Sequence, residues 1–115
     1  MKRLGICLTI ALAITLGGCK SAPKTMYQWE GYQPQVYQHF KGESPEQQIT
    51  ILEKDLEIIR SKGGTPPPGY HAHLGMLYSM IGKTDQMIDQ FQIEKKLFPE
   101  SSTYLDFLLK KVNKT

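Results

Sequence analysis

The chain has 115 residues and a mass of 13.1 kDa, enough for one small domain and not for two. About 40% of the residues are hydrophobic and 22% are charged, a composition typical of a globular protein that excludes a disordered one. The formal net charge is only +3, so the chain lacks the strong positive charge that a nucleic-acid-binding domain uses against phosphates.

The first 18 residues have the pattern of a secretory signal. Lys2 and Arg3 precede a nearly continuous apolar run, Leu4 to Leu16. This run is shorter than the ~20 residues of a permanent membrane-spanning helix. The sequence therefore predicts a cleaved signal helix over residues 1–18, with a retained signal anchor as the alternative. Removing Lys2 and Arg3 leaves 12 basic residues against 11 acidic ones, a nearly balanced mature chain.

The end of the apolar run, Leu16-Gly17-Gly18-Cys19, resembles the lipobox of bacterial lipoproteins. The resemblance implies cleavage before Cys19 and transfer of a diacylglycerol to its thiol. Two or more acyl chains, palmitate among them, anchor a protein stably to a membrane. Lys20, rather than Asp, follows the cysteine, which by the same resemblance implies the periplasmic face of the outer membrane; the inner membrane is the alternative. The other cysteine, Cys7, lies in the signal, so the mature domain has no cysteine for a disulfide, a metal or catalysis.

Residues 19–26 read as a short polar tether, and residues 27–115 as the folded domain. The domain opens with an aromatic segment, 27–42, in which Pro34 can begin a short helix. The segment has two interpretations: it packs over the domain's own core, or it contacts a partner or lipid headgroups, for which Tyr and Trp are well suited. On the second interpretation, the candidate partner-binding residues are Tyr27, Trp29 and Tyr32.

The clearest helix signal covers residues 45–62. Ser44 is a good N-cap, Pro45 a good first residue, and Gln47 completes the pattern of a capping box. One apolar stripe recurs at helical spacing, and two further isoleucines widen it, which predicts a helix covered on more than one side. The stripe is Ile49, Leu52, Leu56 and Ile59, and the further residues are Ile51 and Ile58. Gly63 and Gly64 end the helix, and the proline-rich loop 65–69 either spaces two helices or serves as a polyproline ligand.

Residues 68–101 resemble one tetratricopeptide repeat, a helical hairpin with a 34-residue pattern. The spacing predicts helices over 69–82 and 85–97, with Gly75 allowing them to approach closely. His71 stands where the repeat has Trp, and Met87 and Glu94 stand where it has small residues. The positions that match are Leu74, Gly75, Tyr78, Gly82, Phe91 and Pro99.

A last amphipathic helix is expected over 102–112, with lysines near its end. The fold class follows: an all-α domain, namely a tetratricopeptide-like helical hairpin with flanking helices, behind a cleaved N-terminal signal helix. A single repeat does not bury its own apolar faces, so the aromatic segment or a partner must cover them.

No catalytic motif, cofactor motif or metal-binding constellation occurs in the sequence, and we expect a non-enzymatic protein with no cofactor. His71 and His73, two apart on one helix, point in different directions and cannot share a metal. Glu53 and Glu57 are expected to be solvated. Glu94 is expected inside the hairpin, where a buried carboxylate requires a partner such as Lys, Tyr or His, or else a ligand.

Taken together, the mature chain resembles a small family of Gram-negative lipoproteins of unknown function. The resemblance rests on four segments: 27–32, 37–40, 68–78 and 91–101. Members of that family are typically encoded beside a lipoprotein similar to the curli secretion channel. The resemblance implies a periplasmic interaction or scaffold lipoprotein within an envelope complex, with the membrane, other envelope proteins and such a channel-like lipoprotein as partners. The alternative is a lipoprotein that binds a small molecule or peptidoglycan.

Overall fold

The computed structural model describes residues 25–114, and this part of the chain consists of helices and loops. The predicted signal helix and Cys19 lie outside the described residues. In chain order, the helices are α2 (Tyr32–Phe40), α3 (Pro45–Ser61), α4 (Tyr70–Met80), α5 (Thr84–Leu97), the short 3₁₀ helix η1 (Pro99–Ser101) and α6 (Ser102–Val112). The predicted all-α fold class is therefore confirmed for these residues.

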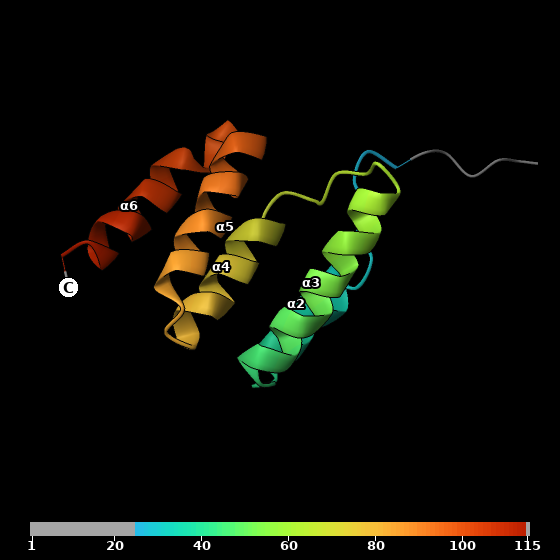
Figure 1. Cartoon of the computed structure of the whole chain (residues 1–115), viewed down its shortest axis with the longest axis horizontal. Helices are drawn as coiled ribbons and strands as arrows, with labels where there is room; N and C mark the ends of the chain where they lie inside the picture. The colour runs from blue at the N-terminus through green and yellow to red at the C-terminus, as the bar shows by residue number, and fades with distance from the viewer. Residues whose placement is uncertain (1–24, 115) are drawn as a thin grey trace, which may run out of the picture.

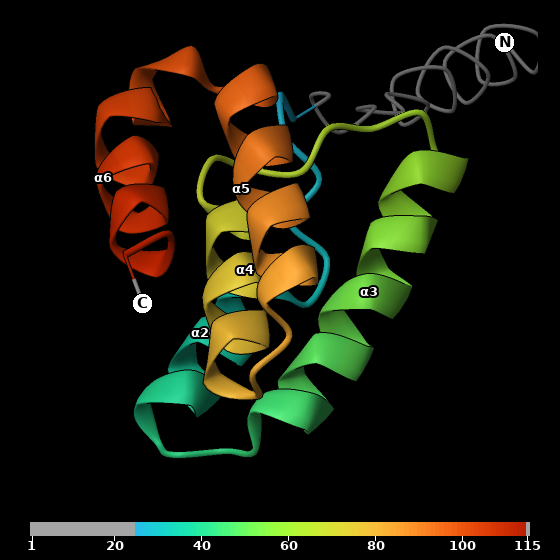
Figure 2. The same ribbon diagram turned by 60° about the vertical axis from the view of Figure 1, so that its left-hand side comes forward.

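Successive helices run in alternating directions; α3 to α6 form a row, and α2 lies against both α3 and α4 (Figures 1 and 2). Helices α2 and α3 make one antiparallel hairpin, α4 and α5 make a second, and α6 folds back along α5. Helix α4 packs against both α3 and α5, while α6 packs against α5 and η1. One helix of the second hairpin is thus central, and α6 closes the row at one end.

The four long helices begin and end within two residues of their predicted limits. The aromatic segment contains more helix than the sequence indicates, because α2 begins at Tyr32 and not at Pro34. Pro34 fits the third position of α2 because the N–H groups in the first turn of a helix have no intrahelical partner. The N–H group that proline lacks would make no hydrogen bond within the helix at that position. The helix predicted over residues 45–62 therefore pairs with α2 and forms the second arm of a hairpin.

Helix α3 buries the apolar stripe predicted for it: Ile49, Leu52, Leu56 and Ile59. It contacts α2 and α4, so it is covered on two sides, although Ile51 remains 40% exposed. Ser44 is the N-cap residue, but the predicted capping box is wrong. The Ser44 hydroxyl donates to Glu46 rather than accepting from the backbone, and Gln48 instead donates its side-chain N–H to the carbonyl of Glu43.

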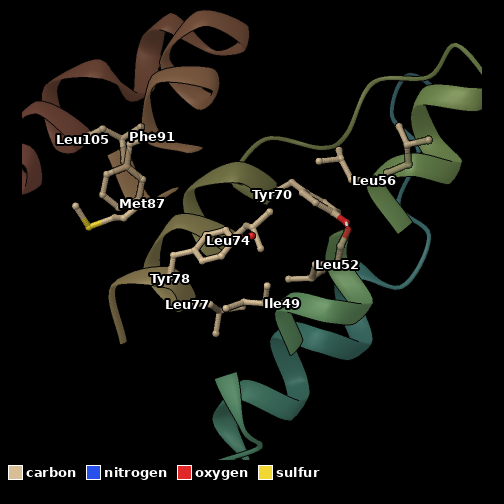
Figure 3. Close-up of a cluster of buried hydrophobic side chains, with 11 residues drawn as sticks. Ile49, Leu52, Leu56, Tyr70, Leu74, Leu77, Tyr78, Met87, Phe91 and Leu105 are labelled. Atoms are coloured by element: carbon tan, nitrogen blue, oxygen red, sulfur yellow. Dashed lines mark hydrogen bonds between the residues drawn. The ribbon is translucent and has the colours of Figure 1, made fainter. Parts of the chain in front are cut away.

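The core lies mainly between α3, α4 and α5 (Figure 3). The close approach of α4 and α5 depends on Gly75: a Cβ atom there would lie 2.6 Å from Cε1 of Phe91, well inside van der Waals contact. The residue is glycine because the ring of Phe91 occupies that space. The buried apolar side chains of the hairpin are Tyr70, Leu74, Leu77, Tyr78, Met87 and Phe91.

The loop between α3 and α4 is a spacer. Pro66 and Pro67 are buried, which excludes them as an exposed polyproline ligand. The backbone N–H of Gln28 donates to the carbonyl of Thr65 at 2.8 Å, so the start of the described chain runs beside this loop. Gly69 is the N-cap residue of α4, and its φ of 90° is a left-handed conformation that glycine adopts readily.

Candidate interaction site

An open groove of about 490 Å³ lies between α4, α5 and α6. This volume is within the range of ligand and peptide sites, ~300–1,000 Å³. Helix α4 supplies one wall, α6 supplies the other, and Met87 and Phe91 of α5 lie between them (Figure 3 shows both beside Leu105). The lining is mostly apolar and comprises Ala72, His73, Met76, Ser79, Met87, Phe91, Tyr104, Leu105, Leu108, Lys111 and Val112.

The rim of the groove leaves apolar side chains in water. Tyr104 is 65% exposed and Met76 is 36% exposed, although both belong to helices with buried faces. Methionine adapts its shape readily, and tyrosine combines an apolar ring with a polar hydroxyl, so both residue types suit recognition surfaces. Lys111 brings an ammonium group to the same wall, and its Nζ lies 4.6 Å from the ring centre of Phe107. The arrangement is suited to holding an apolar group, not to acid–base chemistry.

His73 connects the groove to the N-terminal hairpin. Its ring meets the ring of His39 on α2 edge-to-face, with 5.3 Å between the ring centres, and it also contacts the ring of Tyr32. Burial, with a smaller contribution from the charge of His39, lowers the pKa of His73 to about 4. Its Nε2 atom is buried and has no hydrogen-bond partner among residues 25–114. His73 is therefore neutral at pH 7. Sequence reasoning missed this histidine pair because the two residues are far apart in the chain.

Glu94 is buried, as its position in the hairpin predicts, but the expected side-chain partner is wrong. Its carboxylate accepts hydrogen bonds from three backbone N–H groups at the start of α4: Gly69 at 2.6 Å, His71 at 3.1 Å and Ala72 at 3.3 Å. The first N–H groups of a helix have no intrahelical acceptor and carry partial positive charge, so they stabilise an anion. Glu94 is thus a helix cap supplied by another helix, and its role is structural.

The remaining candidate residues also have structural partners. His71 is buried, and its Nδ1 lies 2.7 Å from Oε1 of Gln90; burial lowers its pKa. Glu53 and Glu57 are exposed, as expected, and the Glu53 carboxylate also accepts a hydrogen bond from the hydroxyl of Tyr78. Within residues 25–114, no group of three or more His, Cys, Asp or Glu side chains is placed to hold a metal ion.

The three aromatic residues predicted to bind a partner have different environments. The ring of Tyr27 contacts Phe98, with 5.9 Å between centres, and Tyr32 packs against the buried Tyr70 at 5.1 Å. Both are half-buried and help to cover the core. Trp29 is 42% exposed, although its ring lies 6.2 Å from that of Tyr32. The sequence could not separate these roles because all three residues lie in one short segment.

The segment is held to the domain by polar contacts as well. The backbone N–H of Gly31 donates to Asp55 at 2.9 Å, and Glu30 forms an ion pair with Lys62 at 2.9 Å. A side chain at Gly31 would collide with Asp55. The aromatic segment is therefore part of the folded domain. Separately, no helix among the described residues is long and apolar enough to cross a bilayer.

The fold and the groove define a small helical domain with an exposed apolar surface. Residues 26–108 match the family described as domain of unknown function DUF4810, and the chain belongs to this family. The match runs from the start of the aromatic segment into α6. No curated protein and no solved structure is significantly similar to the chain.

Proposed function

We propose that this protein is a lipid-anchored periplasmic scaffold that holds another envelope protein in the groove between α4 and α6. The observation that carries the proposal is the open, mostly apolar groove with exposed Tyr104 and Met76 on its walls. Leaving such side chains in water lowers stability unless something covers them, and contiguous exposed apolar surface is typical of interaction sites. Most of the lining is apolar, which supports the binding of an apolar partner surface.

The repeat-like architecture supports a scaffold. Two consecutive antiparallel hairpins are followed by α6, and each helix contacts the next one along the chain, which supports a tetratricopeptide-like arrangement. Stacked helical repeats of this kind present extended concave surfaces that bind partners. We therefore propose a tetratricopeptide-like domain that is non-enzymatic.

The anchor belongs to the same proposal. The sequence Leu16-Gly17-Gly18-Cys19 supports lipidation at Cys19, and Lys20 supports the periplasmic face of the outer membrane. An anchored domain searches a surface, so a modest affinity for another anchored protein is sufficient to form a complex. A lipoprotein similar to a secretion channel is the partner that the family resemblance favours.

Site-specific crosslinking in intact membranes tests the proposal. A photo-crosslinking amino acid replaces Ser79, an exposed residue in the groove wall, in the full-length chain. The matched control carries it at Gln47, an exposed residue of α3 outside the groove. We expect one discrete adduct with an envelope protein from position 79, lost in Leu108→Glu and in Cys19→Ala. Identical adducts from both positions, or none from position 79, would contradict the proposal.

One observation favours a second candidate, a small-molecule-binding lipoprotein. The mostly apolar lining also carries a few polar side chains, those of His73, Ser79, Tyr104 and Lys111, which is the composition of a small-molecule site. Mass spectrometry of the protein purified under native conditions separates the two. A retained small molecule that Leu108→Glu abolishes favours this candidate, while a protein adduct favours the scaffold.

A further inference from the structure

The outer face of α2 carries exposed aromatic side chains that the domain itself does not use. Phe40 is 83% exposed and Tyr37 is 58% exposed, three positions apart on the same face of the helix. Trp29, in the turn before α2, is 42% exposed. The opposite face of α2 carries Gln35, which is buried, and His39, whose ring meets that of His73, so Tyr37 and Phe40 are turned outward by that packing.

This surface differs from the groove in position and in chemistry. None of the groove-lining residues belongs to α2, so the two surfaces have no residue in common. Beside the aromatic rings lies Lys41, whose Nζ is 4.8 Å from the ring centre of Tyr37. Trp and Tyr with a neighbouring lysine are typical of the membrane–water interface, where apolar rings meet lipid and the ammonium group meets headgroup phosphates.

The short sequence distance between Cys19 and Trp29 favours lipid as the group that covers this face. Trp29 follows Cys19 by ten residues, a distance of at most ~35 Å along a fully extended chain. A lipid on Cys19 would therefore keep Trp29 within about 35 Å of the bilayer surface, where the effective concentration of the domain toward lipid is high and even weak contact is populated.

We propose that the aromatic face of α2, with Trp29, Tyr37 and Phe40, lies on the lipid headgroups and fixes the orientation of the domain on the membrane. The proposal rests on the lipid anchor of the proposed function. It adds a second contact with the same bilayer, so the groove is held at a constant orientation rather than turning freely on a flexible tether.

The sole tryptophan of the chain makes this testable, because Trp29 reports its own surroundings. The mature lipidated protein is reconstituted into vesicles of phosphatidylethanolamine and phosphatidylglycerol, with and without shallow brominated lipids. We expect Trp29 emission to shift to shorter wavelength, bromolipid to quench it, and quenching by acrylamide to fall by about half or more relative to detergent-free soluble protein. In a second probe, Trp29→Phe with Phe40→Trp moves the tryptophan onto α2 and should report the same quenching.

Two double variants complete the design. Tyr37→Ser with Phe40→Ser should abolish the bromolipid quenching while the protein still floats with the vesicles. The matched control, Tyr104→Ser with Phe107→Ser, removes two exposed aromatic rings from α6 and should leave the Trp29 signal unchanged. Thermal unfolding by circular dichroism checks that both variants fold.

Two results would overturn the inference and leave the anchor standing. The first is water-like Trp29 emission in protein that floats with the vesicles. The second, in the vesicles with brominated lipid, is shielding of Trp29 from acrylamide without bromolipid quenching, which would mean that a second copy of the protein, and not lipid, covers the face. A protein that carries no acyl chain and does not float would instead contradict the proposed anchor, and this inference with it.

Discussion

Helices α4 and α6 both contain 11 residues, yet they have opposite relations to the core. Helix α4 buries Tyr70, His71, Leu74, Gly75, Leu77 and Tyr78, whereas α6 buries only Leu105. The difference comes from position in the row: α4 lies between α3 and α5, and α6 has α5 and η1 as its neighbours (Figure 1). An interior helix stabilises the domain, and an end helix leaves surface for recognition.

The comparison explains why the groove lies where it does. Its floor comes from the well-packed hairpin, where Phe91 is 3% exposed, and one wall comes from the sparsely covered α6. A rigid floor with an exposed wall presents a fixed shape without requiring the core to rearrange. Substitutions in the two regions should therefore separate stability from binding.

The largest loss of stability is expected in the hairpin, for Phe91→Ala. Removing this buried ring leaves a cavity against Gly75 and should lower the free energy of unfolding by about 3–5 kcal/mol. Urea unfolding followed by circular dichroism measures it. Phe107→Ala on α6, where the ring is 54% exposed, is the control and should change stability by less than about 0.5 kcal/mol. Equal losses in the two variants would show that the assigned burial is wrong.

The helix cap should come next. Glu94→Gln removes the charge and turns a donor group toward the backbone N–H groups of α4, so we expect a loss of about 2–3 kcal/mol. Glu100→Gln, at an exposed position, is the matched control. An unchanged unfolding midpoint for Glu94→Gln would mean that the capping contacts contribute nothing.

The close approach of α4 and α5 can be tested with Gly75→Ala. Alanine favours helix, but its methyl group would collide with the ring of Phe91, and we expect a net loss of about 1–3 kcal/mol. Combining it with Phe91→Leu should cost less than the sum of the two single changes, since the smaller side chain relieves the collision. If the loss of stability in the double variant equals the sum of the two single losses, the methyl group at position 75 does not collide with the ring of Phe91.

Acidification should weaken the junction between α2 and α4. Folding lowers the pKa of His73 to about 4, from about 6.5 in the unfolded chain, and burial lowers the pKa of His71 in the same direction. The unfolded chain then binds more protons, so stability is complete above pH 6.5 and decreases as pH falls toward 4. We expect the free energy of unfolding to fall by about 1–2 kcal/mol between pH 7 and pH 4.5, because His73 is only half-buried and solvent reduces the effect. His73→Phe should reduce this dependence; an unaltered pH profile in that variant would exclude His73 as its source.

The smallest stability effect, and the clearest functional one, is expected on the wall of the groove. Tyr104→Ser should change the free energy of unfolding by less than about 0.5 kcal/mol but weaken the crosslink from position 79. Phe107→Ser, exposed on the same helix but not in the groove lining, should leave the crosslink intact. A crosslink insensitive to Tyr104→Ser would move the partner surface away from this wall.

Local sequence was sufficient to predict the helices and their buried stripes. Apolar residues at helical spacing predict α3 to α6 within two residues, and the repeat pattern predicts that Gly75 faces another helix, because periodicity and turn residues act over one or two helical turns. The same local signals failed at Ser44, where a short polar side chain had another acceptor nearby.

Only the tertiary structure decided which of these side chains meet. The Glu94 carboxylate lies on the N-terminus of α4 because the α4–α5 hairpin brings it there. His39 lies against His73 because the first hairpin packs on the second. Both contacts join residues more than 20 positions apart in the chain. The tertiary structure also divided the aromatic segment, placing Tyr27 and Tyr32 over the core and leaving Trp29, Tyr37 and Phe40 outside. Composition names an aromatic residue, but its burial depends on which helix lies beside it, and that is set by the packing of the whole row.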